Sequence, residues 1–543
     1  MSFFNQTKKP TVTTNFAGGP AYRQSARMEL FSAIVTSLGS DNTYDRFSDR
    51  YHRICDLIRR CDPEFVGKLA VYARTNFNVR TTPIILLVEM AKHFSGSPYI
   101  RLATRNTISR ADELSEVLSA YIALNNRGTS IKKLNKLNNG LRRGISDAFH
   151  KFSEYQFAKY KKANKDVSLR DVFFLTHPKP LNEKEANLFK KIADDTLETP
   201  ETWETIRSAI GQNKDITEEE KQDQKKESWE YLIDNHKLGY MATLRNLCNM
   251  LRDGLSVEYL NKVLWYLSKE DNVKKSKQFP YRFYSAYKEV KKLENDGIKP
   301  KITNDGYSSN ITTINIGEVG NKNNYEDIYP KIYRALEQAA LCAVSNIPGF
   351  SNPNETICIV SDVSGSMDTN INQGKQTSTD SGVTYKEVGL LMSLLLSRVS
   401  KKNDYLLFAT DVGKVNLIDK KENIFSLVQT LVKKINLGYG TNGYKVMKEL
   451  VESKKRFDKI YIFTDMQLYG RDNLNKWWST YKRDIYKNSK LFIMDLAGYG
   501  QVPVAHGNDA TTISGFSEKV FEIIDLLENG TSIVQDIMNL ELK

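Results

Sequence analysis

The chain has 543 residues, of which 40% are hydrophobic and 26% are charged. These fractions are typical of folded globular protein and exclude a mostly disordered chain. No apolar run reaches the roughly 20 residues that span a bilayer, and the N-terminus lacks the apolar core of a signal peptide. The five cysteines are scattered and form no C-x-x-C pair. This pattern argues against a disulfide scaffold and a zinc ribbon, and it indicates a reducing compartment, for which we expect the cytoplasm.

The formal net charge is +13, from 78 basic and 65 acidic residues. A basic surplus on a folded protein suggests an anionic partner, and nucleic acid is the commonest one. Many proteins are basic without binding nucleic acid, so the charge alone leaves the partner open.

The first two thirds of the chain have the pattern of a helical protein. Residues 1–14 are polar and without periodicity, and we expect a flexible arm. From there to about residue 292 the apolar stretches have helical spacing and are broken by Gly, Pro or Asn. Successive helices of this kind predict an α-solenoid of HEAT-like repeats over residues 15–350. No repeat is visible as sequence identity, so an irregular helical bundle is the alternative.

Two segments interrupt the helical pattern. Residues 211–228 are almost entirely polar or charged, and we expect an exposed loop or the solvated end of a helix. Residues 299–327 are rich in Asn, Gly, Thr and Ile, which predicts a hairpin or a linker. A further helix is expected over residues 329–345.

The pattern changes after Pro353. Four short apolar runs, at residues 357–360, 405–409, 460–463 and 491–494, have the character of buried strands. They alternate with helical patterns at residues 386–400, 424–435, 444–452 and 518–527. Alternating strands and helices predict a doubly wound α/β domain over residues 351–535, with a parallel sheet covered on both faces.

Oxygen-bearing side chains gather at the predicted strand ends of this domain. Asp362, Ser364 and Ser366 follow the first strand, Thr441 lies in a later loop, and Asp465 follows the third strand. Open α/β sheets bind ligands at this edge. Two carboxylates and three hydroxyls are hard ligands that suit Mg²⁺ first, and Mn²⁺ or Ca²⁺ next. No His or Cys joins the set, which argues against zinc. The alternative is a serine-rich turn that only caps a helix.

This D-x-S-x-S motif, followed by a loop Thr and a strand-end Asp, resembles the metal-ion-dependent adhesion site of the von Willebrand factor A fold. All five positions match the family pattern. The resemblance implies a bound divalent cation that keeps one position open for an acidic group of a partner.

The helical part resembles the TROVE module of the Ro autoantigen family. The matching strings are Tyr-Ala-Arg at 72–74, Ser-Leu-Arg-Asp-Val-Phe-Phe-Leu-Thr-His-Pro-Lys-Pro at 168–180, and the segments 240–247, 278–287 and 345–350. The following A-type domain completes that family's layout. The resemblance implies a monomer with a ring of helical repeats closed by the A domain. It also implies that small structured Y RNAs bind the ring's outer face and that single-stranded ends of misfolded or decaying RNA enter its hole.

Two acid-poor basic runs provide candidate RNA contacts on the outer face. Each run taken singly is more often a solvated helix face, but the two follow one another beside the family string. The candidates are Arg127, Lys132, Lys133, Lys136, Arg142, Arg143, Lys159, Lys161, Lys162, Lys165, Arg170, His177 and Lys179.

Three further positions have open alternatives. His177 is either a buried, hydrogen-bonded histidine or, as the resemblance implies, an RNA contact, which we favour. Arg245 lies on an apolar helix pattern and either pairs with a carboxylate or lines the hole. Arg282 and the tyrosines around it could stack on unpaired bases, whereas core packing is expected for Phe283 and Tyr287.

These observations favour a noncoding-RNA-binding protein that acts in RNA scaffolding or quality control. The alternative is a metal-dependent interaction scaffold whose A domain recruits an acidic partner, such as a nuclease. The sequence has no Ser/His/Asp order, no phosphate-binding Gly loop and no His/Cys metal set, so we do not expect an enzyme.

Overall fold

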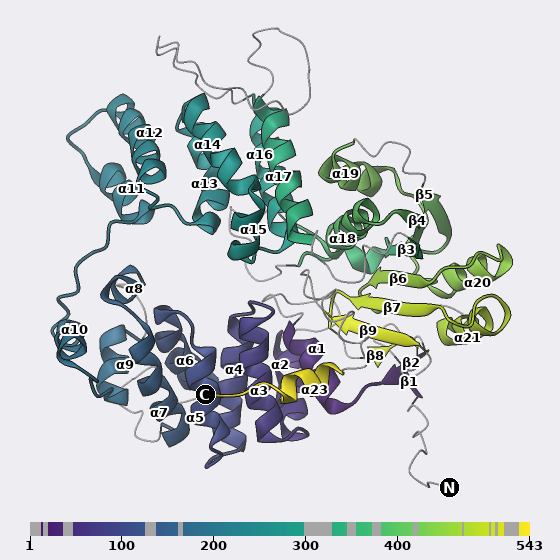
Figure 1. Ribbon diagram of the computed structural model, residues 1–543, viewed down its shortest axis with the longest axis horizontal. Coiled ribbons are helices and arrows are strands. Elements are labelled where there is room, and N and C mark those ends of the chain that lie inside the picture. Colours follow the sequence, from purple (N-terminus) through teal and green to yellow (C-terminus); the bar gives the residue numbers. More distant parts are fainter. Residues whose placement is uncertain are drawn as a thin grey trace. The chain divides into compact units, whose positions relative to one another are not determined.

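The computed structural model describes thirteen segments of the chain, which Figure 1 shows as ribbons. They are residues 12–14, 20–35, 47–124, 137–160, 167–297, 328–344, 354–371, 382–415, 422–469, 472–498, 501–504, 509–514 and 532–543. By its internal contacts the chain divides into two compact units. The first comprises Met1–Pro200, Ile347–Lys420 and Val428–Lys543, and the second comprises Glu201–Asn346 and Lys421–Leu427. The predicted domain boundary between residues 350 and 351 stays a prediction.

The first unit begins with a series of short helices that pack on their neighbours. Helix α3 packs on α4 and α5, α5 on α7, α7 on α9, and α9 on α10. Each helix is too short to be stable alone, so packing of its apolar face supplies most of its stability. The helices are α1 Ala26–Val35, α2 Phe47–Arg59, α3 Pro63–Thr75, α4 Thr81–His93, α5 Tyr99–Thr107, α6 Ala111–Leu124, α7 Asn139–Ala148, α8 Glu154–Lys159, α9 Leu169–Thr176 and α10 Glu183–Ala193.

The second unit is also helical. Its α16 packs on α13 and α17, and α11 packs on α12. The polar stretch 211–228 covers the end of α11 and the solvated first turns of α12, one of the two expected outcomes. The helices are α11 Trp203–Gln212, α12 Glu218–Asp234, α13 Tyr240–Arg252, α14 Val257–Ser268, α15 Glu270–Ser276, α16 Pro280–Asn295 and α17 Ile328–Val344.

The predicted α/β domain is present, and apart from Lys421–Leu427 it belongs to the first unit. Its six-stranded sheet has the order β5-β4-β3-β6-β7-β9, and all neighbours are parallel except the edge strand β5. The strands are β3 Thr356–Asp362, β4 Lys402–Phe408, β5 Val412–Val415, β6 Lys459–Thr464, β7 Lys490–Asp495 and β9 Ala510–Ser514. Helices α18 Tyr385–Val399, α19 Ile424–Lys434, α20 Tyr444–Glu452 and α21 Leu474–Asp484 connect them.

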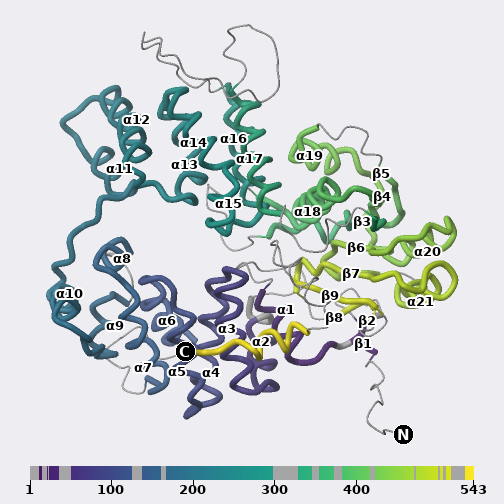
Figure 2. Tube along the Cα trace, viewed as in Figure 1, coloured from purple at the N-terminus to yellow at the C-terminus, as the bar shows by residue number. Residues whose placement is uncertain are grey.

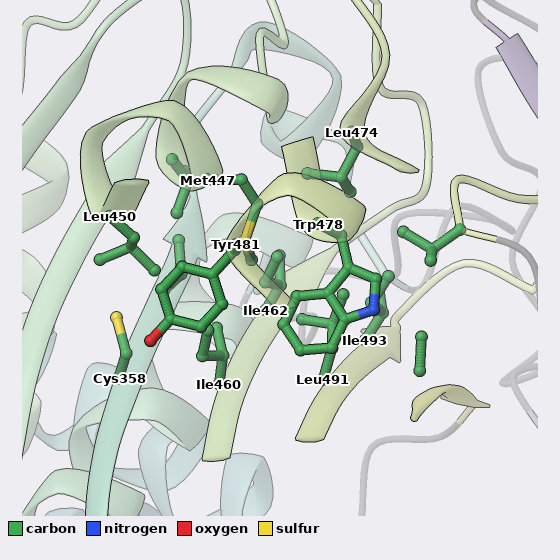
Figure 3. Packing of buried hydrophobic residues seen from close by; sticks show 14 of the residues in the cluster. Cys358, Met447, Leu450, Ile460, Ile462, Leu474, Trp478, Tyr481, Leu491 and Ile493 are labelled. Carbon is green, nitrogen blue, oxygen red and sulfur yellow. The ribbon is translucent and has the colours of Figure 1, made fainter. Parts of the chain in front are cut away.

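Helices cover both faces of this sheet. Helix α18 packs against β3 and β6. The opposite face forms an apolar core with α20 and α21, in which Trp478 and Tyr481 lie over the strands (Figure 3). Side chains of β3 point to opposite faces of the sheet. Cys358 belongs to this core, whereas the hydroxyl of Ser361 donates a hydrogen bond to that of Ser393 on α18. The doubly wound architecture is therefore confirmed.

Described segments near both ends of the chain contact other parts of the first unit (Figure 2). Strand β1, Val12–Thr14, pairs antiparallel with β2, Pro20–Arg23, which pairs with β8, Gln501–Val502. The prediction of a flexible arm is therefore wrong for residues 12–14, because they gain ladder hydrogen bonds. Near the C-terminus, helix α23, Ile533–Met538, packs on α3.

All five cysteines are free. In the part of the chain that the structure describes, no helix is long and apolar enough to cross a membrane.

Candidate metal site and RNA interface

The predicted metal ligands lie at the carboxyl edge of the sheet. Asp362 is the last residue of β3, and Ser364 and Ser366 follow it, the latter in the short helix η4, Gly365–Asp368. Asp465 comes directly after β6. Because β3 and β6 are neighbouring parallel strands, with Ser361 opposite Phe463, their ends meet at one place.

Hydrogen bonds fix the orientation of these side chains. Asp362 Oδ1 accepts from the backbone N–H of Ser364 at 2.9 Å, and its Oδ2 accepts from the hydroxyl of Thr464 at 2.6 Å. The hydroxyls of Ser364 and Ser366 lie 3.3 Å apart, and Ser366 also bonds the Asp465 carboxylate. Hydrogen bonds within the chain therefore fix the positions of these side chains.

Thr441 joins the site through the backbone of its loop. The N–H of Gly365 donates to the carbonyl of Tyr439 at 3.1 Å, and the N–H of Tyr469 donates to the carbonyl of Thr441 at 2.8 Å. The loop is thus attached both to the turn after β3 and to the turn after β6. Thr441 is itself buried.

The site places two buried carboxylates close together. Burial raises the pKa of both Asp362 and Asp465, and the negative charge of Asp362 raises the pKa of Asp465 further. Among the described residues neither carboxylate has a Lys or Arg ion-pair partner. The charge of Lys386 lowers the pKa of Asp362 without forming an ion pair with it, and Lys386 pairs with Asp368 at 2.7 Å. A divalent cation would compensate both charges. The two carboxylates and three hydroxyls fit Mg²⁺, and their assignment as ligands stays a prediction.

A third buried carboxylate at this edge has other partners. Asp495, the last residue of β7, accepts hydrogen bonds from the N–H groups of Ala497 and Gly498 at 3.0 and 2.7 Å. It also accepts from the hydroxyl of Ser514 at 3.1 Å. These bonds satisfy Asp495 within the protein, so we do not add it to the predicted ligand set.

Sequence reasoning missed three residues at this site. It did not assign the role of Thr464, although this residue precedes Asp465. It also missed Tyr439 and Tyr469, which are 86% and 60% exposed although their backbones bond the site loops. Nothing in the local pattern distinguishes an exposed loop tyrosine from a packed one.

The candidate RNA contacts divide into two groups. Seven lie outside the described residues: Arg127, Lys132, Lys133, Lys136, Lys161, Lys162 and Lys165. On α7, Arg142 is half-buried and Arg143 is exposed. The remaining outer-face candidates lie on or beside α8 and α9.

On α8 and α9 the cations lie beside exposed aromatic rings. The ammonium of Lys159 lies 5.6 Å from the ring centre of Tyr155. The guanidinium carbon of Arg170 lies 5.6 Å from the ring centre of Phe174. Tyr155 and Phe174 are about half exposed, and Lys159 and Arg170 are exposed. Sequence reasoning missed these two rings, although Phe174 lies four residues after Arg170 on the same helix.

His177 is exposed, which agrees with an RNA contact and not with the buried alternative. It is the C-cap of α9 and has left-handed backbone geometry, with φ of 48°. The chain therefore leaves the helix at His177, which does not extend the α9 face on which Arg170 lies. Lys179, two residues later, is also exposed.

In the second unit, Arg245 is exposed on α13 and has no ion pair or hydrogen bond from its side chain to any described residue. This argues against the structural alternative, in which Arg245 pairs with a carboxylate. Arg282 is half-buried, with its guanidinium carbon 4.9 Å from the ring centre of buried Tyr281. Phe283 and Tyr287 are buried, so their expected core packing is confirmed.

Comparison with known families covers nearly the whole chain. The family model of the TROVE domain matches residues 22–225 and 195–349, and that of the Ro60 vWA domain matches residues 356–527. The chain belongs to the Ro family. The resemblance of the helical part to the TROVE module and that of the C-terminal part to a von Willebrand factor A domain are confirmed by these matches.

The relatives are similar in sequence or in structure. The chain is 27% identical to telomerase protein component 1 of Mus musculus over 342 residues, which are 50% of this chain and 13% of that protein. The protein of the same name from Rattus norvegicus is 26% identical over 347 residues, covering 49% and 12%. The chain thus spans about an eighth of the length of these relatives.

A solved structure shares the fold. The crystal structure of the Deinococcus radiodurans RO (RSR) protein aligns with a TM-score of 0.57 at 17% identity, covering 92% of this chain and 98% of that one. The predicted fold class, helical repeats followed by a von Willebrand factor A domain, is confirmed.

Proposed function

We propose that this chain is an RNA-binding protein of the Ro type that acts by binding, without catalysis of its own, in RNA scaffolding or quality control. Membership of the Ro family supports an RNA partner in general. In the finer proposal, a small structured RNA of the Y type binds the surface of α8 and α9. Single-stranded RNA ends bind a second place that includes Arg245, in the hole of a ring.

The observation that carries this proposal is the pairing of exposed cations with exposed rings, which we call the α8–α9 surface. It consists of Tyr155, Lys159, Arg170, Phe174, His177 and Lys179. Lysine and arginine contact phosphates, and an exposed ring can stack on an unpaired base. A helix face that contacts only solvent is expected to carry polar side chains and not two half-exposed aromatic rings.

The test compares two variants with equal change in charge. In the first, Arg170→Gln and Lys179→Gln neutralise the α8–α9 surface. In the control, Lys184→Gln and Lys190→Gln neutralise two exposed lysines of α10 that have no ion pair with a described residue. The affinity of each for a structured small RNA is measured over a series of salt concentrations. Each phosphate that the protein no longer neutralises should reduce the salt slope by about 0.7 to 0.9.

The outcome separates contact from general electrostatics. The first variant should bind more weakly with a shallower slope, whereas the control should behave as wild type. Equal slopes for all three proteins would contradict the α8–α9 surface. Failure of the wild type to bind any structured RNA would contradict the proposed function.

The proposal for single strands depends on Arg245. Its guanidinium is exposed and available, whereas its neighbour Asn246 is buried and donates to the carbonyl of Ala242 at 2.9 Å. This bond lies within α13, so the helix buries Asn246 on one face and exposes the Arg245 cation on another. A free arginine of this kind can contact the phosphates of an unpaired strand.

A second candidate function is metal-dependent recruitment of an acidic protein partner, such as a nuclease. It is supported by the two buried carboxylates without an ion-pair partner among the described residues, and by exposed Tyr439 and Tyr469 beside them. Asp362, Ser364, Ser366, Thr441 and Asp465 would hold Mg²⁺. When bound, the cation supplies an electrophilic centre for a partner's carboxylate. The test is calorimetric titration of the protein with MgCl₂, in which absence of saturable binding would contradict the site.

A further inference from the structure

The edge of the six-stranded sheet opposite the candidate metal site carries a cluster of cations. Strands β4, β6 and β7 each begin with a lysine, namely Lys402, Lys459 and Lys490. The turns before these strands add more. We define the basic edge as the exposed residues Lys401, Lys402, Lys454, Lys455, Arg456 and Lys487.

The sheet topology brings these residues together. Lys402 lies opposite Thr356, and Lys459 lies opposite both Ile357 and Lys490. The starts of four neighbouring strands are therefore aligned. From β4 to β7 is three strand spacings, which is about 14 Å. Residues far apart in sequence thus form one continuous edge.

Hydrogen bonds between the turns hold this edge in place. The N–H of Asp458 donates to the carbonyl of Thr356 at 2.8 Å, and the N–H of Lys490 donates to the carbonyl of Asp458 at 2.9 Å. The carboxylate of Asp458 also accepts from the N–H of Thr356 at 2.7 Å. The backbone at the starts of these strands is therefore fixed by hydrogen bonds, which set the positions from which the cationic side chains extend.

The carboxylates of this edge are occupied mainly by inner lysines. Buried Lys459 pairs with Glu355 at 2.9 Å, and buried Lys482 pairs with Asp509 at 2.5 Å. Within the basic edge, Lys455 pairs with Asp404 at 2.6 Å. The other five members, Lys401, Lys402, Lys454, Arg456 and Lys487, form no ion pair with any described residue. Their positive charge is left for an external partner.

We propose that the basic edge binds the phosphate backbone of RNA, as a second contact surface separate from the α8–α9 surface. This inference rests on the proposed function, since it requires an RNA partner. The contact is independent of RNA sequence, because lysine and arginine on phosphates read no bases.

The composition of the edge favours a polyanion over a protein partner. A protein interface has an apolar or aromatic centre. The exposed large apolar side chains of the described residues lie elsewhere, for example Tyr439 and Tyr469 at the opposite edge. An open hollow of about 700 Å³ also lies at this edge, lined by Ser479, Lys482, Arg483, Lys487, Asn488 and Asp509. It offers room for a backbone segment beside the cations.

The test again uses variants with equal change in charge, in the full chain. The edge variant carries Lys401→Gln, Lys402→Gln, Arg456→Gln and Lys487→Gln. All four side chains are exposed and unpaired with described residues, so folding should be unaffected. The control carries Lys275→Gln, Lys277→Gln, Lys433→Gln and Lys434→Gln, which are likewise exposed and have no ion pair with a described residue.

Both variants are titrated with one structured small RNA over a salt series. The slope of the edge variant should fall by about 0.7 to 0.9 for each phosphate that the edge no longer neutralises, and the control should keep the wild-type slope. In parallel, lysine acetylation of the wild-type protein is compared without RNA, with RNA and with polyglutamate. RNA should protect Lys401, Lys402 and Lys487.

An unchanged slope in the edge variant, while the wild type binds RNA, would overturn the basic edge and leave the proposed function standing. An equal decrease in the control would also overturn it, because general charge would then explain the effect. Protection of the edge lysines by polyglutamate but not by RNA would overturn it in favour of an acidic protein. Failure of the wild type to bind RNA would contradict the proposed function itself.

Discussion

The hydroxyl of Thr464, the last residue of β6, donates a 2.6 Å hydrogen bond to Oδ2 of Asp362, the last residue of β3. The bond crosses between two neighbouring parallel strands, at the edge where the candidate metal site lies. It orients one of the two carboxylates, although Thr464 is not itself one of the predicted ligands. Groups that orient a ligand in this way contribute substantially to metal affinity.

Replacing Thr464 with Val should therefore weaken Mg²⁺ binding by about 10- to 100-fold, since valine keeps the shape of the side chain and removes the donor. Calorimetric titration with MgCl₂ measures the change. Thr464→Ser is the matched control because it keeps the hydroxyl, and it should retain most of the affinity. Equal losses in both variants would show that packing, and not the hydrogen bond, is responsible.

Replacing Asp362 with Ala should abolish Mg²⁺ binding and leave the fold intact, because the site lies at the rim of the sheet. The variant also removes one of two buried negative charges, so its stability without metal should equal or exceed that of the wild type. Elemental analysis gives the metal content, and thermal unfolding with and without MgCl₂ gives the stability. Unchanged metal content would contradict the site.

The affinity for Mg²⁺ should increase with pH. Burial raises the pKa of Asp362 and Asp465, so in the metal-free protein protons compete with the cation above the ordinary carboxyl range. The folded state then holds more protons than the unfolded state. Stability without metal should therefore fall as the pH rises from about 4 towards neutrality, and Mg²⁺ should remove this loss. Unfolding curves over that range, with and without MgCl₂, measure both effects; pH-independent Mg²⁺ affinity would contradict the prediction.

Replacing Arg245 with Glu should weaken binding of an RNA that carries a 3′ single-stranded tail, because a negative charge would then face the phosphates. Binding of a blunt, structured RNA at the α8–α9 surface should change little. Arg252→Glu is the matched control, since Arg252 is also exposed and lies at the end of the same helix. Paired titrations at one salt concentration measure the effect. No difference between the two variants for the tailed RNA would make Arg245 irrelevant to that mode.

Replacing Gly144 with Ala should destabilise the first unit by about 1 to 3 kcal/mol. Helix α7 approaches α5 so closely there that an added Cβ would lie 2.6 Å from Thr104 Cβ and 2.7 Å from the carbonyl oxygen of Arg101. Chemical unfolding measures the change. Gly211→Ala in α11 is the control, because an added Cβ there meets nothing within 4 Å, and it should be neutral or slightly stabilising. A neutral Gly144→Ala variant would show that α5 and α7 can separate at little cost.

Much of the fold and part of the site could be predicted from local patterns. The strand end at Asp362 and the helix that begins at Tyr444 follow from apolar periodicity, and the predicted bounds agree closely with β3 and α20. The candidate metal ligands follow from hard oxygen side chains at successive strand ends, in the order of a known family, and their assignment stays a prediction.

Other features could not be predicted, because they depend on partners distant in sequence. Strand β2 pairs with β8, so Tyr22 lies opposite Val502. The half-exposed ring of Phe174 beside Arg170 required the packing of α9 on its neighbours to be known. The left-handed conformation of His177, which ends α9, also depends on how the chain leaves the helix.

The sequence by itself determined the main helices and the central strands, the family and the identity of the candidate ligands, because the spacing of apolar and polar residues expresses local backbone geometry directly. Only the tertiary structure decided which charges remain available. Lys401 and Lys459 are both lysines next to a strand start, yet Lys401 is exposed and unpaired with described residues whereas Lys459 is buried against Glu355. Burial and ion pairing are properties of the folded surroundings, and they determine whether a lysine stabilises the protein or can bind an anion.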